Sequence, residues 1–118
     1  LPTEAVERIV AIMQDRGLTA KISSIHVNGW FGTYDKLAMT LRMARECFAV
    51  ELDREREHYI FIGDSPNDAP MFGYFPHAIG VANVRDFESE LAHRPTYVAG
   101  KRCGAGFREC VDFLLASK

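Results

Sequence analysis

The stretch that decides the fold is Tyr59-Ile60-Phe61-Ile62-Gly63-Asp64-Ser65-Pro66-Asn67-Asp68. Its first four residues are continuously apolar and favour β-structure, which is typical of a strand covered on both faces in a parallel sheet. After Gly63-Asp64, a Ser and an Asp are available as helix caps, and Pro66 suits a first helical turn. The stretch therefore predicts a buried strand that leads directly into a helix.

The remainder of the second half repeats this alternation. Residues 78–82 and 96–99 predict two more short strands, residues 86–91 predict a short helix, and a final helix is predicted after Gly104-Ala105-Gly106. Strands that alternate with helices are typical of the α/β class with a mostly parallel sheet and right-handed crossovers.

The first half begins with a helical pattern over residues 1–17, with Thr3 as its N-cap and Gly17 as a left-handed stop. Residues 19–27 predict a strand, and Asn28-Gly29 predicts the turn after it.

A second helix is predicted to follow, capped by Thr33 and continuing to Phe48. The strongly charged stretch of mixed sign at residues 52–58, with Glu51 before it, then predicts a solvated connection before the strand at residues 59–62.

Composition narrows the functional classes. The chain has 118 residues, which predicts a single domain, and its 14 basic and 16 acidic residues give 14 − 16 = −2, so a nucleic-acid binder with a basic face is disfavoured. Hydrophobic residues make up 47%, which argues for a folded domain, but no stretch approaches the roughly 20 apolar residues of a membrane span. Three cysteines without C-x-x-C spacing favour a reduced, cytoplasmic protein.

The end of the decisive strand predicts a binding site, because ligands in open α/β sheets bind at the carboxyl ends of the strands. Asp64 and Asp68 are four residues apart and can point into one space, where Mg²⁺ would find the oxygen ligands it prefers. Ser65 and Asn67 add hydrogen-bonding groups, and a helix amino terminus favours phosphate. Spacing alone leaves a second interpretation open, in which the two aspartates only cap the helix.

Lys36 is a further candidate. It lies near the start of a predicted helix, where the helix dipole opposes a cation, so an anionic partner would compensate. An ordinary surface lysine is the competing interpretation.

These residues resemble a known family. The pattern G-D-x-x-N-D-x-x-M at residues 63–71, Lys36 within Tyr-Asp-Lys-Leu-Ala, and Gly80-Val81-Ala82-Asn83 are similar to the haloacid dehalogenase superfamily of phosphohydrolases, in its Cof-type and sucrose-phosphatase-like branch. The resemblance covers the chain from about Thr19 to its end. It implies a Rossmann-like three-layer core with a mostly parallel sheet, whose carboxyl-terminal part is residues 33–118. Residues 1–32 would be the hinge and the tail of a cap domain, with its last helix and strand.

The resemblance also implies roles. Lys36 would steady the nucleophile and the substrate phosphate, Asp64 would bind Mg²⁺, and Asp68 would support the metal shell and the catalytic group. Asn67 and Ser65 would contact the substrate. The whole enzyme would hydrolyse a small phosphorylated metabolite, such as a sugar phosphate, through an aspartyl-phosphate.

The chain departs from the family, whose second-motif Ser or Thr has no counterpart that can be assigned here. It contains no D-x-D segment, which in the family supplies the nucleophile and the general acid. We therefore expect the chain to be the final portion of such an enzyme and inactive alone. The strand at residues 59–62 would then be a bare apolar edge that pairs with the missing amino-terminal portion or with a second copy.

Two other hypotheses remain. The chain would be a naturally shortened, non-enzymatic module for interaction or phosphate binding, or a subunit completed by a separate amino-terminal chain. An in-frame D-x-D segment upstream of Leu1 would indicate a fragment, and a start codon immediately before Leu1 would indicate the module. Copurification with an amino-terminal chain would indicate the subunit.

Overall fold

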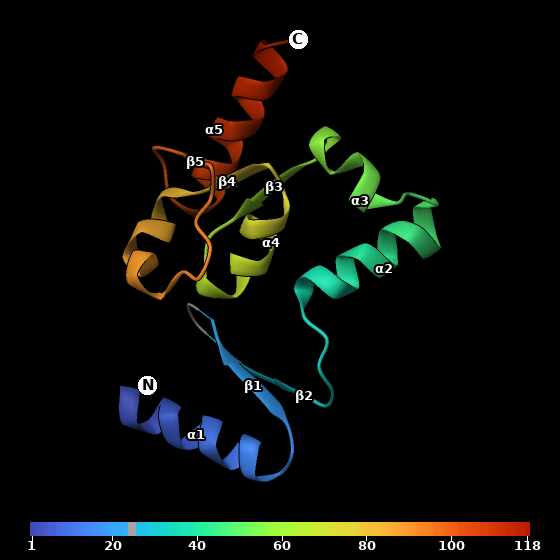
Figure 1. The fold of residues 1–118 in the computed structure, drawn as a ribbon. Helices are drawn as coiled ribbons and strands as arrows, with labels where there is room; N and C mark the ends of the chain where they lie inside the picture. The colour runs from blue at the N-terminus through green and yellow to red at the C-terminus, as the bar shows by residue number, and fades with distance from the viewer. Residues whose placement is uncertain (24–25) are drawn as a thin grey trace. The chain divides into compact units, whose positions relative to one another are not determined.

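The computed structural model describes residues 1–23 and 26–118, which form two units, Leu1–Asp35 and Lys36–Lys118 (Figure 1). The chain length predicts one domain, whereas the resemblance to the family predicts a boundary between cap and core after residue 32. Each unit is described by itself below.

The first unit consists of a helix and a hairpin. Helix α1 (Thr3–Asp15) precedes the antiparallel strands β1 (Thr19–Ile22) and β2 (Val27–Trp30). Gly17 has a φ of +82°, which confirms the predicted left-handed stop. The N-cap is Pro2, so the prediction that Thr3 is the cap was wrong by one residue.

The predicted turn at Asn28-Gly29 is wrong, because both residues lie inside β2, opposite Lys21 and Ala20. A Cβ on Gly29 would lie 2.9 Å from the sulfur of Met13. This glycine therefore allows α1 to pack closely on the hairpin, a requirement that a local turn pattern does not reveal. Of the predicted strand at residues 19–27, residues 24 and 25 lie outside the described part of the chain.

The second unit is built on a parallel sheet in the order β3-β4-β5, as the decisive stretch predicted. The strands are β3 (Ile60–Gly63), β4 (His77–Gly80) and β5 (Tyr97–Val98), and Gly63 is in register with Gly80. Strand β3 is at an edge of this sheet among the described residues, which leaves one side of its backbone without a neighbouring strand. The fold is α/β and Rossmann-like.

Four α-helices and three 3₁₀ helices accompany this sheet. They are α2 (Lys36–Phe48), α3 (Leu52–Glu55), η1 (Arg56–His58), η2 (Pro66–Asp68), α4 (Ala69–Tyr74), η3 (Ala82–Glu90) and α5 (Cys103–Ala116). Helix α2 begins at Lys36, so Thr33 is not its cap. The helix predicted at residues 86–91 is the 3₁₀ helix η3, which begins earlier and ends at Glu90.

The core lies between α2, α4 and one face of the sheet. Phe61 of β3 packs edge-on against Phe72 at a ring separation of 5.6 Å and stacks on Phe75 at 6.1 Å. On the other face, Ile60 and Ile79 line an apolar cavity with Phe113 of α5. Side chains of adjacent residues in β3 thus point to opposite, apolar surroundings, which is why the strand is continuously apolar in sequence.

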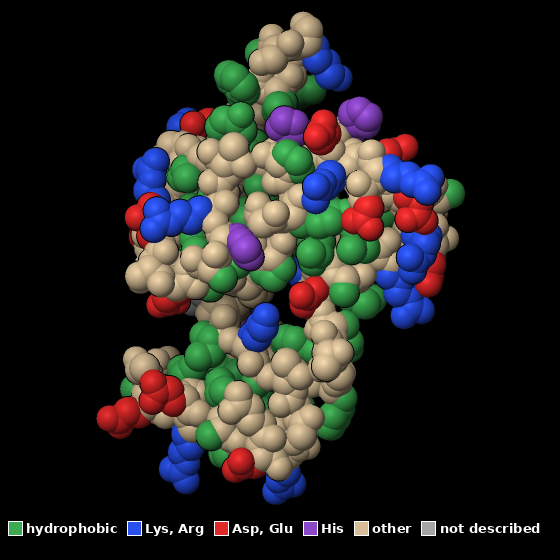
Figure 2. All heavy atoms as spheres, in the orientation of Figure 1, with side chains coloured by type: hydrophobic (Ala, Val, Ile, Leu, Met, Phe, Trp, Pro, Cys, Tyr) green, Lys and Arg blue, Asp and Glu red, His purple; other side chains and the backbone are tan. Residues whose placement is uncertain are grey.

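The charged run before β3 is helical rather than an irregular connection. Leu52 is buried and anchors α3, while the charged side chains of α3 and η1 are exposed, so the prediction that they are solvated is confirmed. On the face drawn in Figure 2, basic and acidic side chains lie intermixed in this part of the unit. Among the described residues, no helix combines the length and the apolar character that crossing a membrane requires.

Candidate functional site

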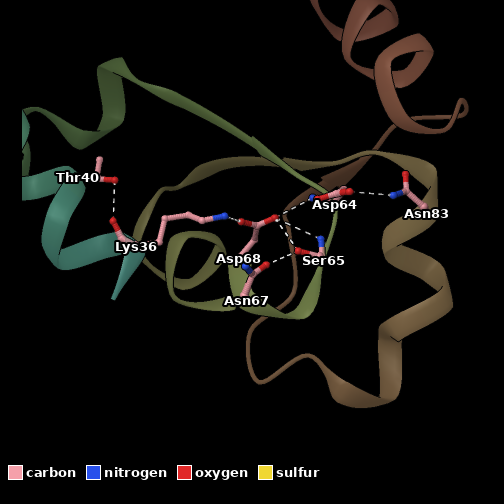
Figure 3. Close-up of polar contacts among 7 residues, drawn as sticks. All are labelled: Lys36, Thr40, Asp64, Ser65, Asn67, Asp68 and Asn83. Atoms are coloured by element: carbon pink, nitrogen blue, oxygen red, sulfur yellow. Dashed lines mark hydrogen bonds and ion pairs between the residues drawn. The ribbon is translucent and has the colours of Figure 1, made fainter. Parts of the chain in front are cut away.

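The candidate site lies where β3 ends and the chain enters η2 (Figure 3). Ser65 is the N-cap residue in extended conformation, and Pro66 occupies the first helical turn, as predicted. Ser65 and Asp68 form a capping box, in which each side chain interacts with the backbone of the other residue. This local pattern turns the chain sharply and brings Asp68 back against the end of the strand.

Asp68 is the central residue of the site. Its side chain is only 3% exposed, and Oδ1 accepts a hydrogen bond from the ammonium group of Lys36. Oδ2 accepts hydrogen bonds from the backbone N–H groups of Asp64, at 2.9 Å, and Ser65, at 3.2 Å. Both carboxylate oxygens therefore have partners within the chain, which explains how a buried charge is tolerated here.

The glycine before Asp64 is a steric requirement of this arrangement. A Cβ on Gly63 would lie 2.7 Å from Oδ2 of Asp68 and 2.9 Å from its Cγ. Because Asp68 is held by Lys36 and two backbone N–H groups, it has little freedom to retreat. Gly63 thus allows the carboxylate to approach the strand end closely.

Asp64 is in a different environment. It is half-buried, and Oδ2 accepts a hydrogen bond from Nδ2 of Asn83 at 3.1 Å. Oδ1 accepts no hydrogen bond from any residue in the described parts of the chain. Asp64 also lines an open hollow of about 320 Å³ together with Cys103 and Phe107.

Lys36 comes from a distant part of the sequence. It is the first residue of α2, where its backbone carbonyl accepts a hydrogen bond from Oγ1 of Thr40 at 2.8 Å. Its side chain is 44% exposed and spans to Asp68. Lys36 is thus an exposed lysine whose anionic partner is the carboxylate of Asp68.

The two neutral residues of the loop are paired with each other. The hydroxyl of Ser65 donates a hydrogen bond to Oδ1 of Asn67. Ser65 is buried and Asn67 is half-buried. All five residues singled out from the sequence thus lie together at the end of β3 (Figure 3).

The two aspartates perform different tasks in the structure. For Asp68, the helix-capping interpretation is correct, since it belongs to the capping box and also holds Lys36. For Asp64, an oxygen remains available. The described residues contain no group of three or more His, Cys, Asp and Glu side chains that could hold a metal ion. Mg²⁺ often uses one or two carboxylates completed by waters and substrate phosphate, so one carboxylate at this hollow is compatible with it.

Sequence reasoning missed Asn83 and the steric role of Gly63. Asn83 belongs to the motif G-V-A-N, but its hydrogen-bond partners Asp64 and Cys103 lie about 20 residues away in either direction. Gly63 belongs to the motif G-D-x-x-N-D, and its steric role depends on how the turn brings Asp68 of the same motif back against it. Arg102, at the beginning of α5, forms an ion pair with Asp86, and its guanidinium lowers the pKa of that carboxyl group.

Comparisons with known proteins bear on the fold alone. No protein-family model and no curated protein matches the chain. A crystal structure of the Thermoplasma acidophilum protein 0175 is similar, with a TM-score of 0.63 and 20% identity, over 96% of this chain. The aligned region is 47% of that protein, so this chain spans just under half its length. The likeness supports the α/β, Rossmann-like architecture.

Proposed function

We propose that this chain is the carboxyl-terminal part of a Mg²⁺-dependent phosphatase of the haloacid dehalogenase superfamily, acting on a small phosphorylated metabolite such as a sugar phosphate. One observation carries the proposal. An ammonium group from α2 and a carboxylate with an unpaired oxygen from the end of β3 lie on either side of the same buried aspartate.

The chain's own residues divide the work in this proposal. Lys36 supplies a positive charge for the phosphate and for an attacking carboxylate, and Asp68 holds that charge in place. Asp64 offers Oδ1 to the metal ion. Mg²⁺, when bound, would neutralise charge on the phosphoryl oxygens. Asp68 was a predicted metal ligand, but with both oxygens engaged it is proposed here only as the residue that positions Lys36.

The nucleophile and the general acid would come from outside these residues. The open edge of β3 supports this, because apolar hollows adjoin Ile60 on both faces of the sheet. A further apolar strand beside β3 would cover those hollows and place its carboxyl end next to Asp64. The upstream portion of the same protein is the proposed occupant, and a second copy is the alternative for the isolated chain.

The first test uses the chain alone. We expect no hydrolysis of p-nitrophenyl phosphate with Mg²⁺, but weak binding of Mn²⁺ that broadens the NMR signals around Asp64. Asp64→Asn should abolish this broadening, whereas Asp86→Asn, which removes the same charge from an exposed site, should leave it unchanged. Turnover by the isolated chain that disappears in Asp64→Ala would contradict the proposed division of the active site.

The second test uses the longer reading frame, if it encodes an upstream D-x-D segment. That protein should hydrolyse phosphomonoesters with Mg²⁺ and lose activity in Lys36→Met and Asp64→Asn. Phosphate binding without any hydrolysis would favour the non-enzymatic module instead.

A further inference from the structure

Asn83 connects three segments of the second unit. It lies in η3, just beyond the end of β4, and is 7% exposed. Its Nδ2 donates to Oδ2 of Asp64, and its Oδ1 accepts the backbone N–H of Cys103 at 3.1 Å. The carboxamide therefore joins the end of β3, through the Asp64 contact drawn in Figure 3, to the beginning of α5.

The orientation of this carboxamide is determined by its partners. A backbone N–H can only donate, so the oxygen of Asn83 must face Cys103. The amino group must then face Asp64, whose ionised carboxylate can only accept. A flipped amide would place two donors together and two acceptors together, and both hydrogen bonds would be lost.

The backbone of the two residues before Asn83 is also held. The N–H of Val81 donates to the carbonyl of Gly63 at 3.0 Å, and the N–H of Ala82 donates to the carbonyl of Lys101 at 2.9 Å. The segment that carries Asn83 is thus tied both to the strand of Asp64 and to the loop before α5.

We infer that Asn83 is a positioning residue: by binding Oδ2 of Asp64 it holds the carboxylate in one rotamer and leaves Oδ1 open to the hollow. Its value for phosphate chemistry rests on the proposed function, but the positioning itself does not. Groups that orient a metal-binding side chain commonly contribute about 10- to 100-fold to metal affinity. Asn83 should therefore act through Asp64, without touching the substrate.

The test compares Asn83→Ala and Asn83→Leu with the wild-type chain and with Asp86→Asn, an exposed control in the same η3 helix. Three-bond couplings of Asp64 in the metal-free chain report its χ1 rotamer, and Mn²⁺ titration reports affinity. We expect a single rotamer in the wild type and the control, averaging in both Asn83 variants, and Mn²⁺ binding at least about tenfold weaker in those variants. A role confined to fold stability would leave the rotamer and the affinity unchanged in the folded fraction.

The outcomes separate this inference from the proposed function. A single Asp64 rotamer and unchanged Mn²⁺ affinity in folded Asn83→Ala would overturn the inference and leave the function standing. If the wild type shows no Asp64-dependent Mn²⁺ binding, the proposed metal site fails, while the couplings still decide the positioning role. If the variants do not fold, hydrogen exchange of the wild-type carboxamides decides: the protons of Asn83 should exchange far more slowly than those of the exposed Asn28, and equal rates would overturn the inference.

Discussion

The two units of this chain combine helices and strands in different ways. In Lys36–Lys118, a parallel sheet has apolar side chains on both faces, and the buried core of the chain gathers around Phe61, Phe72 and Phe75. In Leu1–Asp35, a two-stranded antiparallel hairpin packs with a single helix, and none of its described residues is buried. A hairpin of this kind has little stability of its own.

The difference explains where the candidate site is located. The buried carboxylate of Asp68 is stabilised by backbone N–H groups and a lysine. These donors must be held in fixed positions, and only a well-packed part of the protein can do this. The second unit supplies this through its sheet and core, whereas the first unit has no buried position to offer among its described residues. The comparison leads to four predictions.

The largest expected effect is loss of the aromatic core. Phe72→Ala should lower the free energy of unfolding of the second unit by about 3–5 kcal/mol, because it removes a buried ring that packs on Phe61. Met13→Ala in the first unit should cost only about 1 kcal/mol, because Met13 is half-buried. Urea titrations that follow NMR signals of each unit separately measure both values. Similar losses for the two variants would contradict the difference in packing.

A smaller loss is expected at the strand end. Gly63→Ala should destabilise the second unit by about 1–3 kcal/mol, because the new methyl group would overlap with Asp68. The ammonium of Lys36 should lose its partner at the same time, which its side-chain ¹⁵N signal would report. An unchanged Lys36 signal in this variant would show that Asp68 can move without leaving the ion pair.

Gly17 offers the matched substitution in the first unit. No atom lies within 4 Å of the position that a Cβ would take, but φ is +82°. Gly17→Ala should therefore cost about 1 kcal/mol, from backbone strain alone. Gly17→Asn should cost less, since asparagine adopts this conformation more readily. The same urea titration measures both, and equal costs for the two variants would argue against a backbone origin.

The smallest effect concerns pH. Tyr74 donates a hydrogen bond to Asp53 at 2.6 Å, and partial burial together with this carboxylate raises the pKa of Tyr74 from 10 to about 12. The unfolded chain then releases the phenolic proton at lower pH than the folded chain. The stability contributed by this bond is complete below pH 10 and is lost as the pH rises toward 12.

Tyr74→Phe removes this dependence. Between pH 10 and about 12, the wild type should lose stability faster than Tyr74→Phe in urea titrations. Tyr97→Phe is the control, because Tyr97 is 58% exposed, and it should follow the wild type. Parallel curves for all three proteins would rule out the raised pKa.

Particular residues show how far prediction from sequence extends. The apolar run before Gly63 predicted β3 within one residue, and the Ser-Pro pair predicted the helical turn after it, because both signals are local. The prediction of a turn at Asn28-Gly29 was wrong. Gly29 lacks a side chain because Met13, which is 29 − 13 = 16 residues away along the chain, packs against it. A dipeptide pattern carries no information about such a contact.

The same limit applies to the site. Spacing placed Asp64 and Asp68 at one strand end, but it assigned them a shared role. The structure separates their roles through residues that are distant in sequence. Asp68 binds Lys36 and has both carboxylate oxygens hydrogen-bonded, whereas Asp64 binds Asn83 through Oδ2 only.

The sequence by itself determined the α/β class, the parallel strand of residues 60–63 and the acidic loop that follows, because apolar runs, glycines and caps act over a few neighbouring residues. Only the tertiary structure decided which aspartate is buried against Lys36 and which one is held by Asn83. It also showed that a side chain at position 63 would clash with Asp68. Those properties depend on atoms brought together by packing, and the free energy of a buried charge is set by the partners it meets there.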